Sequence, residues 1–460
     1  MARADMRVPA RVFADRELIG QIVADRSLEQ LQNVATLPGI TGAALAMPDI
    51  HQGYGFPVGG VAATETPEGI VSPGGVGYDI NCGVRLLALP LAAAELAGRA
   101  EALVHEISRR VPVGAGHGGA LKLKSAALDR VLVDGPKILL AEHGIGTGQD
   151  VEHTESNGSL AGADPAAVSE RARVRGSDQL GTLGSGNHFL ELQRVARILD
   201  ATVAEAFGLG PDQVTVLIHS GSRGLGHQVC TDYVRLMDAV LARYRITLPD
   251  RQLACAPLKS AEGQRYMGAM ACAANFAWAN RAVLAHRVRE SVARILGPRV
   301  AEGTRQVYDV AHNVAKLEIH DGRELCVHRK GATRAFPAGA TEIPAAYREV
   351  GQPVFIPGSM GTSSFVLVGL PGAMERSFGT TCHGAGRRMS RTGARRTITG
   401  AELRHQLEAQ GIVVRCPSNR GLAEEAPFAY KDVERVVAVV EQAGLAGRVA
   451  QLVPVGVVKG

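Results

Sequence analysis

Apolar residues recur along this chain with two spacings, and each spacing predicts a different kind of element. Stretches rich in alanine carry apolar residues three or four positions apart, as in helices with one buried face. These stretches are residues 91–111, 162–175, 228–246, 264–297, 400–410 and 431–446. Short β-branched runs predict strands at 83–89, 214–219, 307–311, 354–356, 365–368, 412–416 and 453–458. Helices and strands do not alternate regularly enough for a doubly wound sheet, so we expect a complex α+β fold of mixed α/β content.

No Pro/Ser linker, charge block or repeat divides the sequence. Glycine-rich motifs instead run from about residue 47 to the last residue. This distribution predicts a single catalytic domain over residues 1–460, assembled from distant segments. Residues 144–177 are polar and rich in glycine and aspartate, which predicts a lid or a surface excursion.

Composition places the chain among ordinary globular proteins, with 46% hydrophobic and 21% charged residues. A net charge of +5 permits a polyanionic partner without demanding one. The seven cysteines are odd in number and widely spaced without a CxxC motif, which favours a reducing compartment. The start lacks the apolar core of a signal peptide, and no apolar stretch reaches the ~18 residues needed to span a bilayer. We expect a cytoplasmic protein with no membrane partner.

Five residues beside apolar runs are candidate metal ligands: Asp79, Cys82, His188, His219 and His312. Asp79 and Cys82 lie three apart in a glycine-rich turn, and a thiolate can bridge two neighbouring ions. Each histidine alone is more often a polar residue satisfied by the fold, and Cys82 alone a structural thiol. Together they favour a metal site, for which zinc, iron and manganese are all suitable.

Nucleotide chemistry is indicated without the usual motifs, since the chain has neither a P-loop nor a Lys-x-Asp-Gly sequence. Residues 357–364 (PGSMGTSS) lie between two predicted strands and offer successive N–H groups and hydroxyls to phosphate. His383 begins His-Gly-Ala-Gly-Arg-Arg, which places an imidazole beside two guanidinium groups. His383 could attack an α-phosphate, or it could be a fourth histidine ligand; residue chemistry alone leaves both open.

Nine motifs over nearly the whole chain resemble the RtcB family of GTP-dependent RNA ligases. They are residues 47–53 (MPDIHQG), 72–83, 179–191 (QLGTLGSGNHFLE), 219–229 (HSGSRGLGHQV), 309–313 (DVAHN), 357–365, 382–391 (CHGAGRRMSR), 425–432 (EAPFAYKD) and 457–460.

The resemblance implies the mixed fold peculiar to that family and two Mn(II) ions on the five candidate ligands, with Cys82 touching both ions. It implies that His383 attacks GTP to form a histidine–GMP intermediate, and that Asp49 orients His383. GMP would then pass to an RNA 3′-phosphate, and a 5′-hydroxyl would attack the activated end. A 2′,3′-cyclic phosphate end would first be opened by hydrolysis.

The resemblance also implies contacts to GTP. Asn187 and Asn313 would contact phosphates, Phe189 and Tyr430 would flank guanine, and Glu191 and Lys459 would contact its edge or the ribose. The other expected contacts are Pro357, Gly358, Ser359, Met360, Ser364, Gly384, Ala385, Gly386 and Arg387. The family acts in tRNA splicing and in RNA repair, and some members need the partner archease; this sequence separates neither pair of possibilities.

Two other functions compete with an RNA ligase. A metal-dependent hydrolase such as a cyclic phosphodiesterase would use His383 as ligand or general acid and would need no GTP. A non-catalytic RNA-binding protein is disfavoured by the mild net charge and by the few aromatic residues, 1 Trp, 8 Tyr and 10 Phe.

Overall fold

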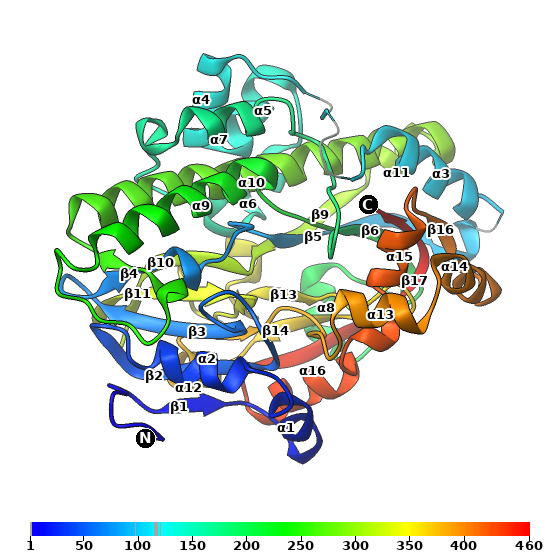
Figure 1. Ribbon diagram of the computed structural model, residues 1–460. Helices are drawn as coiled ribbons and strands as arrows, with labels where there is room; N and C mark the ends of the chain where they lie inside the picture. Colours follow the sequence, from blue (N-terminus) through cyan, green and yellow to red (C-terminus); the bar gives the residue numbers. More distant parts are fainter. Residues whose placement is uncertain (1, 97, 115–117, 120) are drawn as a thin grey trace.

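Two antiparallel-rich sheets form the centre of the computed structural model, which describes residues 2–96, 98–114, 118–119 and 121–460 (Figure 1). The larger sheet has the order β13-β14-β17-β6-β7-β5-β9, with β16 paired to β17. Its strands are β5 (Gly83–Ala92), β6 (Phe189–Ile198), β7 (Gln213–Ser220), β9 (Arg305–Ala311), β13 (Pro353–Ile356), β14 (Ser364–Gly369), β16 (Val413–Arg415) and β17 (Ala446–Lys459).

A five-stranded sheet lies beside it in the order β1-β2-β3-β11-β10. Its strands are β1 (Ala10–Val12), β2 (Ile40–His51), β3 (Val58–Glu65), β10 (Asn313–His320) and β11 (Arg323–Lys330). Two short pairs complete the strands: β12 (Ala332–Arg334) with β15 (Thr380–Cys382), and β4 (Ile70–Val71) with β8 (Ala256–Pro257).

Helices α9 (Arg223–Val240) and α10 (Ala261–Leu296) lie across the larger sheet, and α4 (Ser125–Asp134), α5 (Pro136–His143) and α7 (Glu170–Gly176) lie outside them (Figure 1). Leu284 and Val288 of α10 pack on Leu87, Leu190 and Val216 of the sheet, so α10 is buried between two layers. The remaining helices are α1 (Arg16–Ile22), α2 (Ser27–Val34), α3 (Ala100–Arg110), α6 (Gly148–Glu152), α8 (Ala201–Phe207), α11 (Pro298–Glu302), α12 (Pro371–Ser377), α13 (Arg391–Thr397), α14 (Gly400–Ala409), α15 (Asn419–Glu424) and α16 (Val433–Gln442).

The α+β class is confirmed, although some predicted boundaries are wrong. The helix predicted at 91–111 begins only at Ala100, because β5 continues through Ala92. The helix predicted at 228–246 begins earlier, at Arg223, and ends at Val240. Residues 144–177 contain α6, α7 and two short 3₁₀ segments, the first of which is η3 (Glu155–Gly158). Their role as a lid, and the single-domain assignment, stay predictions.

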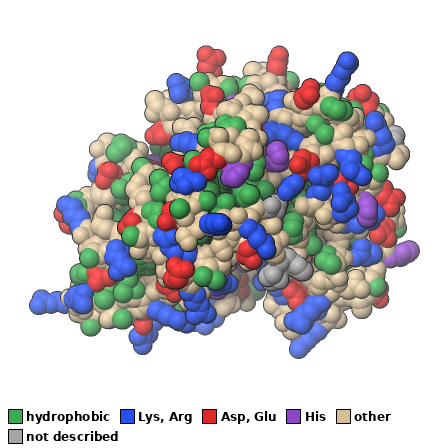
Figure 2. Space-filling view, turned by 90° about the horizontal axis from the view of Figure 1, so that it is seen from above, with side chains coloured by type: hydrophobic (Ala, Val, Ile, Leu, Met, Phe, Trp, Pro, Cys, Tyr) green, Lys and Arg blue, Asp and Glu red, His purple; other side chains and the backbone are tan. Residues whose placement is uncertain are grey.

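The face shown in Figure 2 carries lysine and arginine side chains interspersed with aspartate and glutamate. This mixture agrees with the small net charge of +5. Within the described residues, no helix combines the length and the apolar character that a membrane crossing requires.

Candidate active site

The pairing register brings four of the candidate ligands together at one end of the strands of the larger sheet, and we call this end the sheet edge. Gly83, at the start of β5, pairs with Ala311 at the end of β9 and with Ser220 at the end of β7. Phe189, at the start of β6, pairs with His219. Since neighbouring strands are antiparallel, the residues just outside these pairs, Cys82, His188 and His312, meet His219 at the same edge.

The side chains of this edge form two overlapping sets of donor atoms. One set is Asp79, Cys82 and His188, and the other is Cys82, His219 and His312; within each set the atoms lie within 4.8 Å of one another. Cys82 Sγ lies 3.3 Å from Nε2 of both His188 and His219. Nε2 of His219 lies 3.3 Å from Nε2 of His312, and Asp79 Oδ2 lies 2.8 Å from His188 Nε2. The thiol is therefore the member that the two sets share.

The backbone around the donor cluster is held from beneath by a buried arginine. Arg281 of α10 donates hydrogen bonds of 2.8 Å to the carbonyl oxygens of Asn81 and Ser220. Arg281 thereby joins the turn that carries Cys82 to the end of β7. Gly221 lets the turn approach, because a Cβ at that position would lie 2.4 Å from the carboxylate oxygens of Asp79.

Burial shifts the protonation of the cluster toward neutral forms. The pKa values of His219 and His312 lie well below the ordinary value because of burial and the neighbouring histidines. The pKa of the Cys82 thiol is raised by burial and by Asp79. Burial also opposes ionisation of Asp79, but His188, Arg223 and Cys82 together outweigh it and lower the pKa of that carboxyl.

This donor chemistry fits metal ions. Neutral imidazoles present lone pairs, and a bound cation deprotonates a coordinating thiol, which reverses the effect of burial on Cys82. Two donor sets that share one sulfur suit two neighbouring ions. The combination of nitrogen, sulfur and carboxylate oxygen is compatible with zinc, iron or manganese, and the donor set alone does not choose among them.

His383 lies beside this cluster and belongs to neither donor set. Its ring centre is 4.9 Å from that of His312. Asp49 Oδ2 accepts a hydrogen bond of 2.6 Å from Nδ1 of His383 and one of 3.0 Å from its backbone N–H. With the proton on Nδ1, the other ring nitrogen, Nε2, carries a lone pair. Gly386 packs against Asp49 with φ of 73°, where a Cβ would lie 2.1 Å from the carbonyl oxygen.

The carboxyl of Asp49 is ionised despite full burial. Burial raises its pKa, but His383 and Lys431 together outweigh that effect and leave the pKa below the ordinary value. Lys431 itself donates to the carbonyl oxygens of Pro48 and Ile50, which flank Asp49. The acceptor that holds the His383 ring is therefore a carboxylate, and Lys431 holds the backbone on both sides of it.

A cavity of about 540 Å³ opens over the cluster and His383. That volume is within the range of small-molecule sites. The expected GTP contacts that line it are Asn187, Phe189, Asn313, Pro357, Gly358, Ser359, Met360, Gly384, Ala385, Gly386, Arg387, Tyr430 and Lys459. Glu191 and Ser364 do not line the cavity; Gln193 Nε2 donates to both, at 2.5 Å and 3.0 Å.

Glu191 nevertheless lies next to the cavity, because it shares a face of β6 with Phe189, two residues away. Burial raises the pKa of Glu191 to about 8. Its Oε1 has no hydrogen-bond partner among the described residues. Lys459 is also buried, which lowers its pKa to about 8, and its Nζ lies 5.7 Å from the centre of the Phe189 ring.

Sequence reasoning missed two groups that the structure adds to the site. Glu425 is buried and accepts hydrogen bonds from Arg387 at 3.1 Å and Arg391 at 2.9 Å, and from the hydroxyl of Tyr430. Arg223 Nη1 lies 3.1 Å from Nδ1 of His188. Both residues lie in motifs that carry the family resemblance, 425–432 and 219–229, but neither had been singled out as a site residue.

Two donor sets that share a thiol, with a carboxylate-held histidine at the rim of a cavity, define a candidate metal-dependent active site. Comparison with known proteins agrees with this class. A family model described as tRNA-splicing ligase RtcB matches residues 30–460, so this chain belongs to the RtcB family.

Individual relatives cover nearly the full length. The chain is 53% identical to the tRNA-splicing ligase RtcB of Thermococcus kodakarensis, over 99% of this chain and 95% of the relative. The tRNA-splicing ligase RtcB of Archaeoglobus fulgidus gives the same identity and coverage. The RNA-splicing ligase RtcB of Mycobacterium tuberculosis is 50% identical, over 94% of this chain and all of the relative.

Proposed function

We propose that this protein joins an RNA 3′-phosphate or 2′,3′-cyclic phosphate end to a 5′-hydroxyl end, using GTP and a covalent GMP on His383. The observation that carries the proposal is the Asp49–His383 pair, 2.6 Å between Oδ2 and Nδ1, beside a cluster of five metal-type donors. Membership of the RtcB family supports the ligase reaction.

In the first step, Nε2 of His383 attacks the α-phosphorus of GTP. A nitrogen–phosphorus bond forms, and the bond between the α-phosphorus and the bridging oxygen of pyrophosphate breaks. The Nδ1 proton stays on the ring and faces Asp49, so the carboxylate balances the positive charge that the imidazole acquires.

In the second step, an oxygen of the RNA 3′-phosphate attacks the phosphorus of the histidine-bound GMP. The nitrogen–phosphorus bond breaks, and His383 recovers its lone pair. The RNA 5′-hydroxyl then attacks the activated 3′-phosphorus, a phosphodiester forms, and GMP leaves. A 2′,3′-cyclic phosphate end first takes up water to give the 3′-phosphate.

Two Mn(II) ions would be held by Asp79, Cys82 and His188 and by Cys82, His219 and His312. When bound, they supply positive charge that neutralises phosphate oxygens and lowers the pKa of an oxygen nucleophile. The family resemblance favours manganese. The protein residues would hold the ions, orient the His383 ring and bind the nucleotide.

Guanine would lie between Phe189 and Tyr430, with Glu191 and Lys459 toward its edge and ribose. A carboxylate can accept from both N1–H and N2–H₂ of guanine, a pairing that adenine does not offer. The unpartnered Oε1 of Glu191 supports this assignment. The phosphates would contact Asn187, Asn313 and the turns at Pro357, Gly358, Ser359, Met360, Gly384, Ala385, Gly386 and Arg387, while Ser364 would support the first turn by accepting from the N–H of Gly358 at 3.1 Å.

The RNA substrate class follows from the ligase reaction, whereas splicing and repair are both compatible with the site. A need for archease and a cytoplasmic location stay predictions.

The proposal is tested by incubating the protein with α-labelled GTP, Mn(II) and an RNA that bears 3′-phosphate and 5′-hydroxyl ends. We expect label on the protein, its transfer to RNA, and joined product. His383→Ala should abolish labelling, whereas His405→Ala, which removes an exposed histidine of α14, should not. Full labelling of His383→Ala would place the nucleophile elsewhere. Opening of a cyclic phosphate without GTP use or joining would favour the hydrolase.

A further inference from the structure

Strand β10 ends the five-stranded sheet, and the structure of the described residues places no strand along its outer edge. Its inner edge pairs with β11 through a turn at Asp321 and Gly322, with His320 opposite Arg323. Both turn residues have positive φ, 51° and 73°, as in a type I′ hairpin. In such a hairpin the flanking residues, His320 and Arg323, form a hydrogen-bonded pair.

Strand alternation then fixes the direction of the other backbone groups. Counting back from His320, the N–H and C=O groups of Ala315, Leu317 and Ile319 turn away from β11. The carbonyl oxygen of Glu324, which is opposite Ile319, agrees with this register because it accepts from Thr66 rather than from β10. Within the part of the chain that the structure describes, none of the three outward-facing residues has a backbone hydrogen-bond partner on that side.

The same edge exposes apolar side chains. Leu317 and Ile319 are 51% and 59% exposed, on one face of one strand. Edge strands of stable proteins usually carry charges, prolines or bulges at such positions, since an uncovered apolar edge invites pairing. An uncovered apolar edge with unpaired backbone groups is therefore a candidate binding surface.

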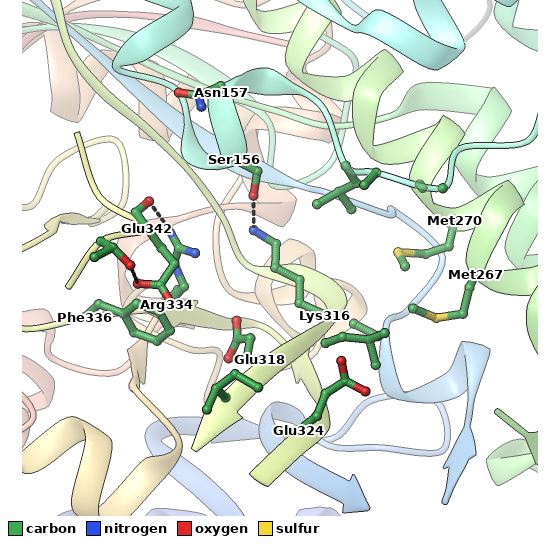
Figure 3. A pocket seen from close by; sticks show the side chains of 18 of the residues that line it. Ser156, Asn157, Met267, Met270, Lys316, Glu318, Glu324, Arg334, Phe336 and Glu342 are labelled. Carbon is green, nitrogen blue, oxygen red and sulfur yellow. Dashed lines mark hydrogen bonds between the residues drawn. The ribbon is translucent and has the colours of Figure 1, made fainter. Parts of the chain in front are cut away.

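A cavity of about 1030 Å³ follows this edge, and every residue from Ala315 to Ile319 lines it. In Figure 3, Met267 and Met270 of α10 lie on one side of Lys316, and Arg334, Phe336 and Glu342 lie on the other. One wall is thus largely apolar and the other largely polar.

The charged side chains that β10 itself contributes to the cavity are paired. Lys316 donates to Ser156 Oγ at 2.8 Å, as drawn in Figure 3, and to Glu155 at 2.5 Å. Glu318 accepts two hydrogen bonds from Arg329, at 2.7 Å and 2.8 Å. Since Lys316 and Glu318 already have charged partners, they favour polar rather than strongly charged side chains in an occupant.

We propose that the edge of β10 binds an extended segment of a partner protein, which adds a strand to the five-stranded sheet. Main-chain hydrogen bonds to Ala315, Leu317 and Ile319 would hold the segment. Because side chains alternate along a strand, its apolar residues would pack on Leu317, Ile319 and Met267, and the intervening polar residues would face the wall that contains Arg334.

Two features favour a peptide segment over other occupants. Ala315 to Ile319 extend over about 14 Å with a repeat of two residues, which a strand matches and a compact small molecule does not. A second copy of this chain would have to bring its own cavity walls, α10 and residues 341–348, against the same walls here. The surface also shares no lining residue with the cavity at His383, so an occupant would not enter the proposed ligase site.

The test uses an array of fluorescent nonapeptides in which Val, Ile or Leu alternates with Thr or Gln, with permuted peptides of the same composition as controls. The full-length protein is titrated against them by fluorescence anisotropy. We expect alternating peptides to bind at least tenfold more tightly than permuted ones. Amide hydrogen exchange should then slow at Leu317 and Ile319.

Two variants challenge different parts of the surface. Leu317→Pro removes an outward N–H at an edge position where proline is tolerated, and Ile319→Lys replaces an exposed apolar side chain. Each should weaken peptide binding at least tenfold while RNA joining is unchanged. Val174→Lys, at a residue of α7 that is 62% exposed, is the matched control and should bind as wild type.

Three outcomes overturn the proposal. The first is equal binding of alternating and permuted peptides, or no binding by either. The second is wild-type binding by both Leu317→Pro and Ile319→Lys. The third is a concentration-dependent dimer in sedimentation that Ile319→Lys dissociates, because the occupant would then be a second copy.

Discussion

Two clusters of buried titratable groups, one around Asp309 and one around Cys82, lie next to each other in this protein. The two clusters differ in the partners that surround their charged and polar atoms. Beneath the sheet edge, Asp309 accepts from Arg85 at 2.7 Å and from Arg281 at 2.8 Å, so opposite charges meet directly. At the edge itself, Cys82 and His219 are surrounded by other metal-type donors at about 3 Å. The first arrangement places opposite charges in direct contact, whereas the donor atoms of the second fit cations.

The Asp309 cluster has a structural role, whereas the Cys82 cluster has the groups that can take part in chemistry. Groups in the Asp309 cluster hold backbone segments in place and leave no donor atoms facing the cavity. Groups in the Cys82 cluster face the cavity and receive their positions from the first cluster through Arg281. Changes in the lower cluster should therefore appear in folding, and changes in the upper cluster in metal and nucleotide binding.

The largest effect is expected from Asp49→Asn, which keeps the size of the side chain and removes the carboxylate. Without it, the Nδ1 proton of His383 and the positive charge on the ring lose their partner. We expect the single-turnover rate of GMP transfer to fall by about 10³-fold or more. Manganese content should be unchanged. A rate within tenfold of wild type would show that Asp49 does not orient the histidine.

Next in size is Arg281→Met, which leaves Asp309 with one of its two arginines and frees the carbonyl oxygens of Asn81 and Ser220. Breaking a buried ion pair on one side typically costs about 3–5 kcal/mol. We expect that loss in the free energy of unfolding measured with urea. Arg287→Met is the control, since Arg287 is a partly exposed residue of the same helix. Equal values for the two variants would remove the structural role from Arg281.

Cys82→Ser should leave the metal-free protein nearly as stable as wild type but remove its response to manganese. At a concentration of 100 times the dissociation constant, a bound ion stabilises a protein by about 2.7 kcal/mol. We expect this gain for each ion bound by wild type and by Cys255→Ser, whose thiol is buried outside both donor sets. If Cys82→Ser keeps the full gain in thermal unfolding, the thiol is not a ligand.

The smallest expected effect concerns pH and Glu191. The pKa of this buried carboxyl is about 8 in the free protein, so the group is mostly protonated at pH 7. Guanine would favour the ionised form and lower that pKa, so GTP binding should tighten as pH rises from 6 to 8. The change approaches tenfold per unit, or about 1.4 kcal/mol. Calorimetric titration of Glu191→Gln should show a flatter profile, and an unchanged slope would contradict this role.

The sequence identified the candidate ligands that cluster in the structure better than it predicted the scaffold around them. The three candidate histidines adjoin strand ends, because His188 precedes β6, His219 lies near the end of β7 and His312 follows β9. His219 and His312 each follow an apolar run, and His188 follows Gly-Ser-Gly-Asn directly before β6, so local patterns mark these positions in the sequence itself. The pairing of β5, β6, β7 and β9 that assembles them depends on contacts between distant segments, which local patterns do not specify.

In other parts of the scaffold, the local sequence pattern either pointed to the wrong structure or did not indicate one. Strands β2 and β3 were missed because alanine and glycine replace the expected β-branched residues in much of their length. Arg281 lies inside an alanine-rich helix, where an arginine is expected to face solvent. Only the folded arrangement shows that it reaches Asp309 across the core.

The central claim is that Cys82 is shared by two metal ions. It is tested most directly by crystallography of the manganese-loaded protein, with anomalous differences recorded at the manganese absorption edge. We predict two peaks that flank Cys82 Sγ, one adjoining Asp79 and His188 and the other adjoining His219 and His312. A single peak, or peaks that do not contact the sulfur, would contradict the account.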